Sequence, residues 1–162
     1  MKTITTSILG LMAPLCLVVG QNKMNIDSLR TVFNNQPLDT LKVKTANHIV
    51  NYYMYRNPDQ AKKFADLELQ ISNELNYDAG VSLAYYQLGI VYNNLDKLDS
   101  ARYYYNSSLD IAEKIQNTVH ISQARRGLAI LEFSQGNLVT ADSINNIDLE
   151  FTIKQNDTMG TA

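Results

Sequence analysis

The residues that could do acid–base or metal chemistry are few in this sequence. His48 and His120 are its two histidines, 72 residues apart, and Cys16 is its single cysteine. A lone cysteine forms neither an intrachain disulfide nor a cysteine cage for zinc. HExxH zinc motifs, glycine-rich phosphate loops and GxSxG nucleophile motifs are all absent. The sequence therefore predicts a protein without catalytic residues, metal ligands or a cofactor.

The remaining polar residues are also predicted to have structural and not catalytic roles. Asp59, Asp78 and Asp99 stand where helices are expected to begin, so we expect them to cap helix starts. Several Asp-Ser and Asp-Thr triplets, such as Asp99-Ser100-Ala101, are similar to acceptors for O-linked sugars in exported bacterial proteins. The alternative, that an Asp followed by a hydroxyl residue simply starts a helix, is favoured. His48 is expected in a core or half-buried position, and His120 in solvent.

Composition sets the class of protein. The chain has 162 residues, 45% of them apolar and 19% charged, with a formal net charge of −2. These values argue against disorder, and the charge gives no basic footprint for nucleic acid. Seven glycines and three prolines are few for a turn-dense β fold, which leaves helix as the favoured structure.

Residues 1–20 have the pattern of a secretory signal peptide. Lys2 gives a positive start, the segment from Ile8 to Val19 is apolar, and Gly20 offers a small residue before a cut. The apolar run of about 12 residues is shorter than the roughly 20 that a membrane-spanning helix needs. We therefore expect export to the periplasm or the extracellular space, with a buried helix and an uncleaved anchor as the alternatives.

A period of forty residues organises the rest of the chain. Ala61, Ala101 and Ala141 repeat at this spacing, and similar sequences surround each of them. The copies are expected at about 41–80, 81–120 and 121–160, behind an N-terminal helix and linker over 21–40. In the middle copy, apolar residues at i, i+3, i+4 and i+7 predict one helix before Asp96-Lys97 and another after it. Asn57-Pro58 and Gly136-Asn137 mark the corresponding turns of the other copies.

The middle copy resembles a tetratricopeptide repeat, and the third resembles it less closely. The residues that carry the resemblance in expected packing positions are Tyr85, Leu88, Gly89, Tyr92, Ala101, Tyr105 and, in the third copy, Ala141. The resemblance implies an all-α, right-handed superhelix of antiparallel helical hairpins, with about three repeats. Gly89 is expected to face Ala101 across the middle hairpin.

The resemblance also implies where a partner would bind. The first helices of such repeats line a concave groove. The positions that fall on it are Tyr53, Tyr86, Ile90, Asn93, Arg126, Ile130 and Phe133. Tyrosine beside an amide and an arginine offers apolar area with hydrogen-bonding tips, which suits a peptide.

We therefore expect a non-enzymatic exported module that binds a peptide or protein, with no nucleic-acid partner. Its leader and repeats look like the exported region of bacterial histidine-kinase or regulator proteins, which implies the sensing part of a larger protein. The forty-residue register ends just as a fourth repeat would begin, so we expect a truncated array. Membrane attachment is expected only through a missing C-terminal region or an uncleaved signal. We also expect self-association through the last repeat. An exported hydrolase on a helical scaffold and a spacer without ligand are the alternatives.

Overall fold

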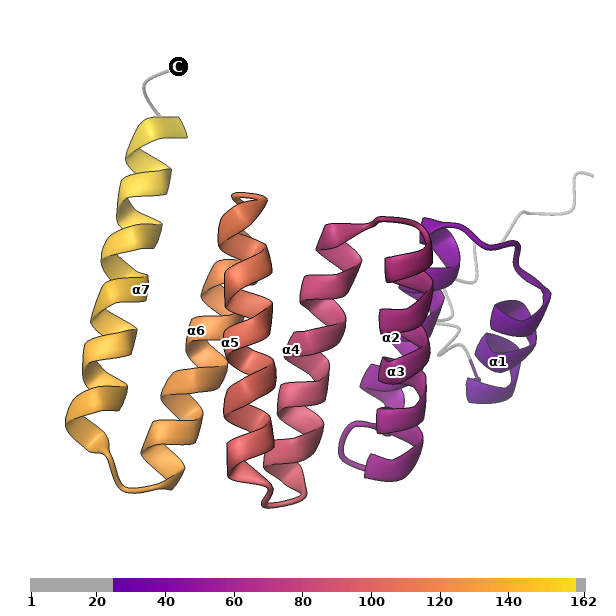
Figure 1. Ribbon diagram of the computed structural model, residues 1–162, viewed down its shortest axis with the longest axis horizontal. Coiled ribbons are helices and arrows are strands. Elements are labelled where there is room, and N and C mark those ends of the chain that lie inside the picture. The colour runs from indigo at the N-terminus through magenta and orange to yellow at the C-terminus, as the bar shows by residue number, and fades with distance from the viewer. Residues whose placement is uncertain (1–24, 160–162) are drawn as a thin grey trace, which may run out of the picture.

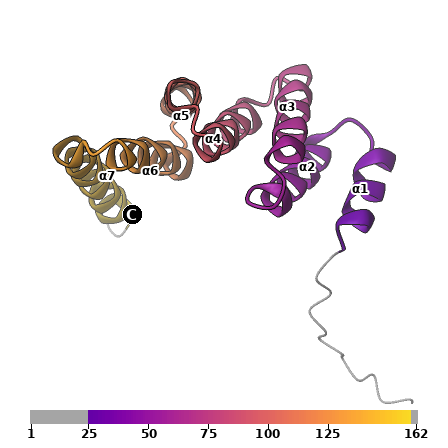
Figure 2. The same ribbon diagram turned by 90° about the horizontal axis from the view of Figure 1, so that it is seen from below.

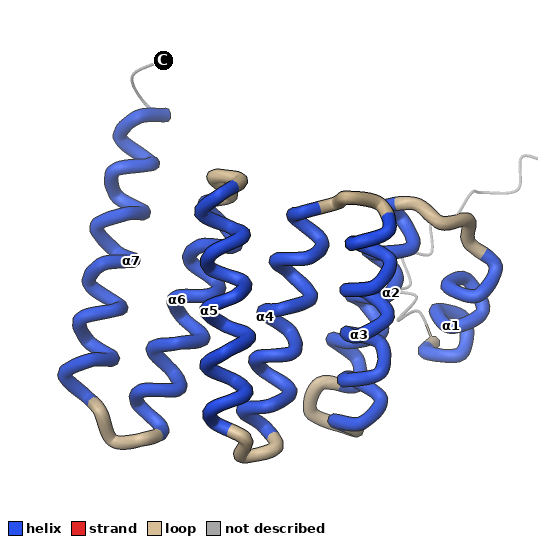
Figure 3. Tube along the Cα trace, viewed as in Figure 1, coloured by secondary structure: helices blue, strands red, loops and turns tan. Residues whose placement is uncertain are grey.

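The computed structural model describes residues 25–159, so the expected signal peptide at 1–20 lies outside the described residues. Within that range the chain forms helices and no strand. The helices are α1 (Ile26–Asn35), α2 (Thr40–Tyr53), α3 (Pro58–Glu74), α4 (Asp78–Asn94), α5 (Leu98–Lys114), α6 (Thr118–Ser134) and α7 (Leu138–Met159). They stack in one row, each running antiparallel to the next (Figures 1 and 3). The expected all-α helical solenoid is confirmed.

The turns that follow α3, α4, α5 and α6 share one backbone geometry. Each contains a residue with positive φ, at Asn76, Asp96, Gln116 and Gly136, so this conformation recurs every twenty residues. After α4, the Lys97 N–H donates to the Tyr92 carbonyl at 2.9 Å and the Asp96 N–H donates to the Asn93 carbonyl at 3.0 Å. These two bonds satisfy the last free carbonyls of the helix in a Schellman motif. Repeated turns of equal length keep the helices from α3 onward in one register.

The turn between α2 and α3 is one residue longer than these. It spans residues 54–57 and contains no residue with positive φ, whereas the turn after α4 spans only 95–97. Asn57 caps α3 by accepting a hydrogen bond from the Gln60 N–H at 3.1 Å, and Pro58 follows at the first helical position. The cap predicted there is confirmed, because Asn57 satisfies a free donor and Pro58 has none to satisfy.

Small residues with a period of forty let the helices approach closely. Ala61 and Ala101 are fully buried and Ala141 is 3% exposed. The other predicted packing residues are buried at Leu88, Gly89 and Tyr105 and half-buried at Tyr85 and Tyr92. Whether Gly89 faces Ala101 stays a prediction: the three atoms nearest to a Cβ built on Gly89 belong to the ring of Tyr105, one turn after Ala101 on α5.

The last helix keeps much of its apolar surface in solvent. Leu138, Val139, Ile147, Leu149 and Ile153 of α7 are all more than half exposed. Phe151 is partly covered, since the Arg125 guanidinium lies 4.9 Å from its ring centroid. Helix α7 packs against α6 alone among the described helices, so its other faces have no partner there.

Candidate functional site

The even-numbered helices form the inner face of the stack. Helix α4 contacts both α2 and α6, while α3 and α5, like α5 and α7, make no contact with each other within residues 25–159. A row of hairpins bends toward the layer whose members touch, so α2, α4 and α6 line the concave side. Figure 2 shows these three helices on one side of the row and α3 and α5 on the other.

Three of the expected partner-binding residues surround one shallow hollow. Arg126, Ile130 and Phe133 lie on α6 and line a cavity of about 180 Å³ together with Ala141, Asp142 and Asn145 of α7. Ile130 is 52% exposed and Phe133 is 66% exposed. Large apolar side chains with this exposure beside a guanidinium give a surface with both apolar and hydrogen-bonding character.

Tyr86 joins this surface from the neighbouring helix. Its ring centroid lies 6.0 Å from that of Tyr105, and its side chain is half-buried. Burial raises the pKa of the Tyr86 hydroxyl, and the positive charge of Arg126 partly opposes this rise. The charge of Arg126 on α6 thus reaches the Tyr86 hydroxyl on α4, forty residues away in the sequence.

Ile90 and Asn93 lie further along α4 and are both half-buried. Ile90 packs against both hydrophobic clusters, the one built from α1 to α4 and the one that holds Ala101, Tyr105, Leu128 and Leu131. Most of the Ile90 side chain therefore belongs to the core, and only its tip is exposed on the inner face.

Tyr53 differs from its expected place. Its ring stacks on Phe64 with a centroid separation of 6.3 Å and an interplanar angle of 14°, against the larger hydrophobic cluster. Tyr92 stacks on Tyr104 in the same way, at 5.1 Å and 16°. Phe64 and Tyr104 are forty residues apart but Tyr53 and Tyr92 only thirty-nine, so Tyr53 takes the packing place that a strict forty-residue register gives to Tyr52. Tyr53 is therefore a packing residue.

The same shift corrects the expectations for the histidines. Ile49, which is fully buried, takes the place that a forty-residue register would give to His48, and His48 is exposed. His120 is half-buried, not in solvent, and burial lowers its pKa. Both histidines line one cavity together with the fully buried Glu68, a juxtaposition that the sequence did not reveal.

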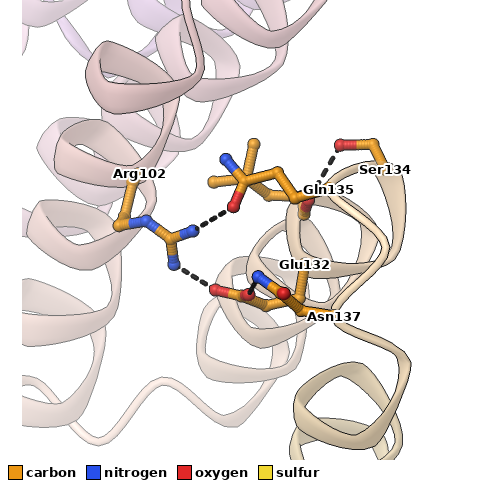
Figure 4. Close-up of polar contacts among 6 residues, drawn as sticks. Arg102, Glu132, Ser134, Gln135 and Asn137 are labelled. Carbon is orange, nitrogen blue, oxygen red and sulfur yellow. Dashed lines mark hydrogen bonds and ion pairs between the residues drawn. The ribbon is translucent and has the colours of Figure 1, made fainter.

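A polar cluster on α5 and α6 also escaped prediction (Figure 4). The Arg102 guanidinium pairs with the Glu132 carboxylate and donates a second hydrogen bond to Gln135 Oε1 at 2.9 Å. Asn137 Nδ2 donates to the other oxygen of Glu132 at 2.8 Å. The hydrogen bond from Arg102, followed by that from Asn137, lowers the pKa of Glu132. Glu132 thus connects α5, α6 and the turn before α7 through hydrogen bonds, so its role is structural.

Within 25–159, no group of three or more histidine, cysteine or acidic side chains is arranged to hold a metal ion. None of the described helices combines the length and apolar character needed to cross a membrane.

Comparison with known proteins yields one likeness of fold. Neither the known protein families nor the curated proteins contain a match to this chain. Among solved structures, a protein described as BtubC (BKLC) from P. vanneervenii is similar, with a TM-score of 0.67 and 18% sequence identity. The similarity covers 82% of this chain and 56% of that one, so the chain spans little more than half the length of that protein. At this identity the likeness concerns the helical fold alone.

Proposed function

We propose that this protein is a non-enzymatic, exported module of the tetratricopeptide-repeat type that binds a peptide or protein along its inner face. The observation that supports the proposal best is the grouping of Arg126, Ile130 and Phe133 around one hollow on the inner helix α6. Tyr86 of α4 lies near enough for the charge of Arg126 to affect its pKa. Interfaces are enriched in tyrosine and arginine, and exposed apolar side chains contribute affinity when a partner covers them.

The helical solenoid and the tyrosines at the expected packing positions support the assignment to the tetratricopeptide-repeat type. Export is proposed from the pattern of residues 1–20, and a place in a larger signalling protein from the resemblance of the leader and repeats. A repeat stack suits binding because its concave side presents side chains from several hairpins to one extended ligand.

A displayed library of random peptides, selected on the chain comprising residues 21–162, tests the proposal. The enriched peptide is then titrated calorimetrically against the unmodified chain and the variants Arg126→Glu and Phe133→Ser. We expect at least a tenfold loss of affinity in both, because each changes an exposed inner-face residue.

Arg30→Glu on α1 and Tyr103→Ser on the outer helix α5 are the matched controls, since both residues are exposed and lie away from the inner face. Equal loss in the controls, or a selection that enriches no saturable binder, would contradict the proposal.

A further inference from the structure

A second cavity lies between α2 and α4, away from the hollow beside Phe133. It has a volume of about 190 Å³. Val43, Tyr77 and Leu83 give it apolar walls, and His48 and His120 line it from α2 and α6. Because α2, α4 and α6 supply most of its wall, the cavity belongs to the inner face.

Glu68 of α3 is the unusual group in this cavity. Its side chain is fully buried, and neither carboxyl oxygen makes a hydrogen bond of good geometry. Burial raises the pKa of Glu68, although the Asn47 side chain, which also lines the cavity, lies near enough to lower it in part. Forty residues later, Ser108 is equally buried but satisfied: its hydroxyl donates to the Ser82 carbonyl at 2.8 Å, and the Ser82 hydroxyl donates to the Ser108 carbonyl at 3.0 Å. A buried carboxyl without well-formed hydrogen bonds is costly, so the contrast indicates that Glu68 serves a ligand.

A further buried polar atom among the lining residues is the Nδ1 of His120, which has no hydrogen-bond partner. Burial lowers the pKa of His120, so its ring is neutral at pH 7 and one of its nitrogens accepts hydrogen bonds. The carboxyl oxygens and this ring both accept hydrogen bonds. Burial disfavours the ionised form of Glu68, and a cation beside it would restore that form. The suitable ligand therefore donates hydrogen bonds and carries positive charge.

The size of the cavity limits the ligand further. Sites for drug-sized molecules have volumes of about 300–1,000 Å³. A cavity of about 190 Å³ with apolar walls fits one alkyl chain that ends in a charged head. A metal ion is the wrong ligand, because the described residues place no three suitable groups together.

We propose that this cavity binds the basic side chain, lysine or arginine, of a peptide on the inner face, with its cationic group paired to Glu68. This inference rests on the proposed function for the source of the side chain, but not for the chemistry of the cavity. The methylene groups would lie against Val43 and Leu83, and the ring of Tyr77 would offer a cation–π contact.

The two histidines provide the test, since the chain has no others and both line the cavity. The probes are Nα-acetyl-lysine N-methylamide, its arginine analogue and its norleucine analogue, which keeps the alkyl chain but not the charge. The ring resonances of His48 and His120 are followed by NMR during titration. We expect saturable shifts of both rings with the lysine or arginine probe and none with the norleucine probe.

Glu68→Gln keeps the shape of the side chain and removes its charge, so we expect at least a tenfold loss of affinity for the cationic probe. Glu74→Gln is the matched control, because Glu74 is exposed on the same helix. Lys44→Ala should strengthen cation binding, since Lys44 is an exposed positive charge at the edge of the cavity.

Unshifted histidine resonances, equal shifts with the norleucine probe, or unchanged affinity in Glu68→Gln would each overturn the inference. The small probes need no protein partner, so their failure leaves the peptide selection described above untouched. Conversely, a chain that binds the probes but enriches no peptide would overturn the proposed function alone.

Discussion

Gly127 of α6 lies so close to the ring of Tyr105 of α5 that an added Cβ would stand 2.4 Å from Cε1 of that ring. Gly89 of α4 approaches the same ring from its own helix, with the corresponding distance to Cδ1 at 2.5 Å. Tyr105 is 2% exposed, and burial raises the pKa of its hydroxyl far above the usual range. The glycines make room for a large ring where three helices meet, because a side chain at either position would occupy the space of the ring.

Gly127→Ala is therefore expected to destabilise the fold although alanine is the better helix former. The propensity gain is about 1 kcal/mol and overpacking costs about 1–3 kcal/mol, so the net loss should be about 1 kcal/mol. Urea denaturation measures it. The loss should shrink when Tyr105→Leu is present in the same chain, and a more stable single variant would contradict this packing.

Turn geometry gives a prediction of the opposite sign. Gln116 has a φ of 54°, a left-handed conformation that costs a residue of this type about 1–2 kcal/mol. Gln116→Gly should raise the free energy of unfolding by about 1 kcal/mol, part of the gain being offset by the greater freedom of glycine in the unfolded chain. Thermal melting tests this. Asn76→Gly should change stability less, because asparagine tolerates the left-handed region, and equal gains at both turns would refute the explanation.

The fold could be predicted further than the site could. The alanines at 61, 101 and 141 and the turn at Gly136 follow the forty-residue period, and the structure buries or places them accordingly. The first copy diverges in sequence, and Ile49 and Tyr53 of α2, which pack inward, lie one residue off that period. His48 and Tyr53 were misplaced for this reason: a repeat count does not reveal a one-residue offset when the neighbouring positions are also apolar or aromatic.

The cavity at Glu68 could not be inferred from the sequence for a different reason. A carboxylate on an amphipathic helix normally faces solvent, and Glu68 belongs to α3, whose charged residues are otherwise exposed or half-buried. Its burial results from the packing of both α2 and α4 against α3. Likewise, Glu132 stands at the position of Tyr92 one period later, and only the packing of α5 against α6 brings Arg102 to it.

The pH dependence of stability should report the burial of Glu68. Desolvation by burial raises its pKa well above 4.5 in the folded state. The folded state then holds this proton more tightly than the unfolded state, so stability falls as pH rises from about 4.5 toward the folded-state pKa. Each unit of difference costs about 1.4 kcal/mol. Glu68→Gln should thus be more stable than the unmodified chain at pH 8 and equal to it at pH 4, as measured by urea denaturation. A difference that is the same at both pH values would contradict a raised pKa.

Glu132 should behave in the opposite way. Its hydrogen bonds with Arg102 and Asn137 lower its pKa below 4.5 in the folded state. Stability from these bonds is complete above about pH 4.5 and is lost as pH falls through the folded-state value. Glu132→Gln should lose stability at pH 7 and less at pH 3, where the carboxyl of the unmodified chain is also protonated. Glu150→Gln, an exposed acid on α7, is the control. A pH-independent loss would show that shape, not charge, accounts for the effect.

The exposed apolar side chains of α7 give the last prediction. Ile147 is 52% exposed, Leu149 59% and Ile153 51%, and α7 packs on α6 alone among the described helices. Exposed apolar side chains of this kind favour association, because burying apolar surface contributes about 25 cal/mol per Å². The chain comprising residues 21–162 should therefore self-associate as its concentration rises in sedimentation velocity. Ile147→Glu with Leu149→Glu should shift this equilibrium toward monomer by at least tenfold, whereas Asn106→Glu on exposed α5 surface should not. A chain that stays monomeric at millimolar concentration would refute the prediction, and equal effects of the two sets of variants would assign the association to net charge instead of to α7.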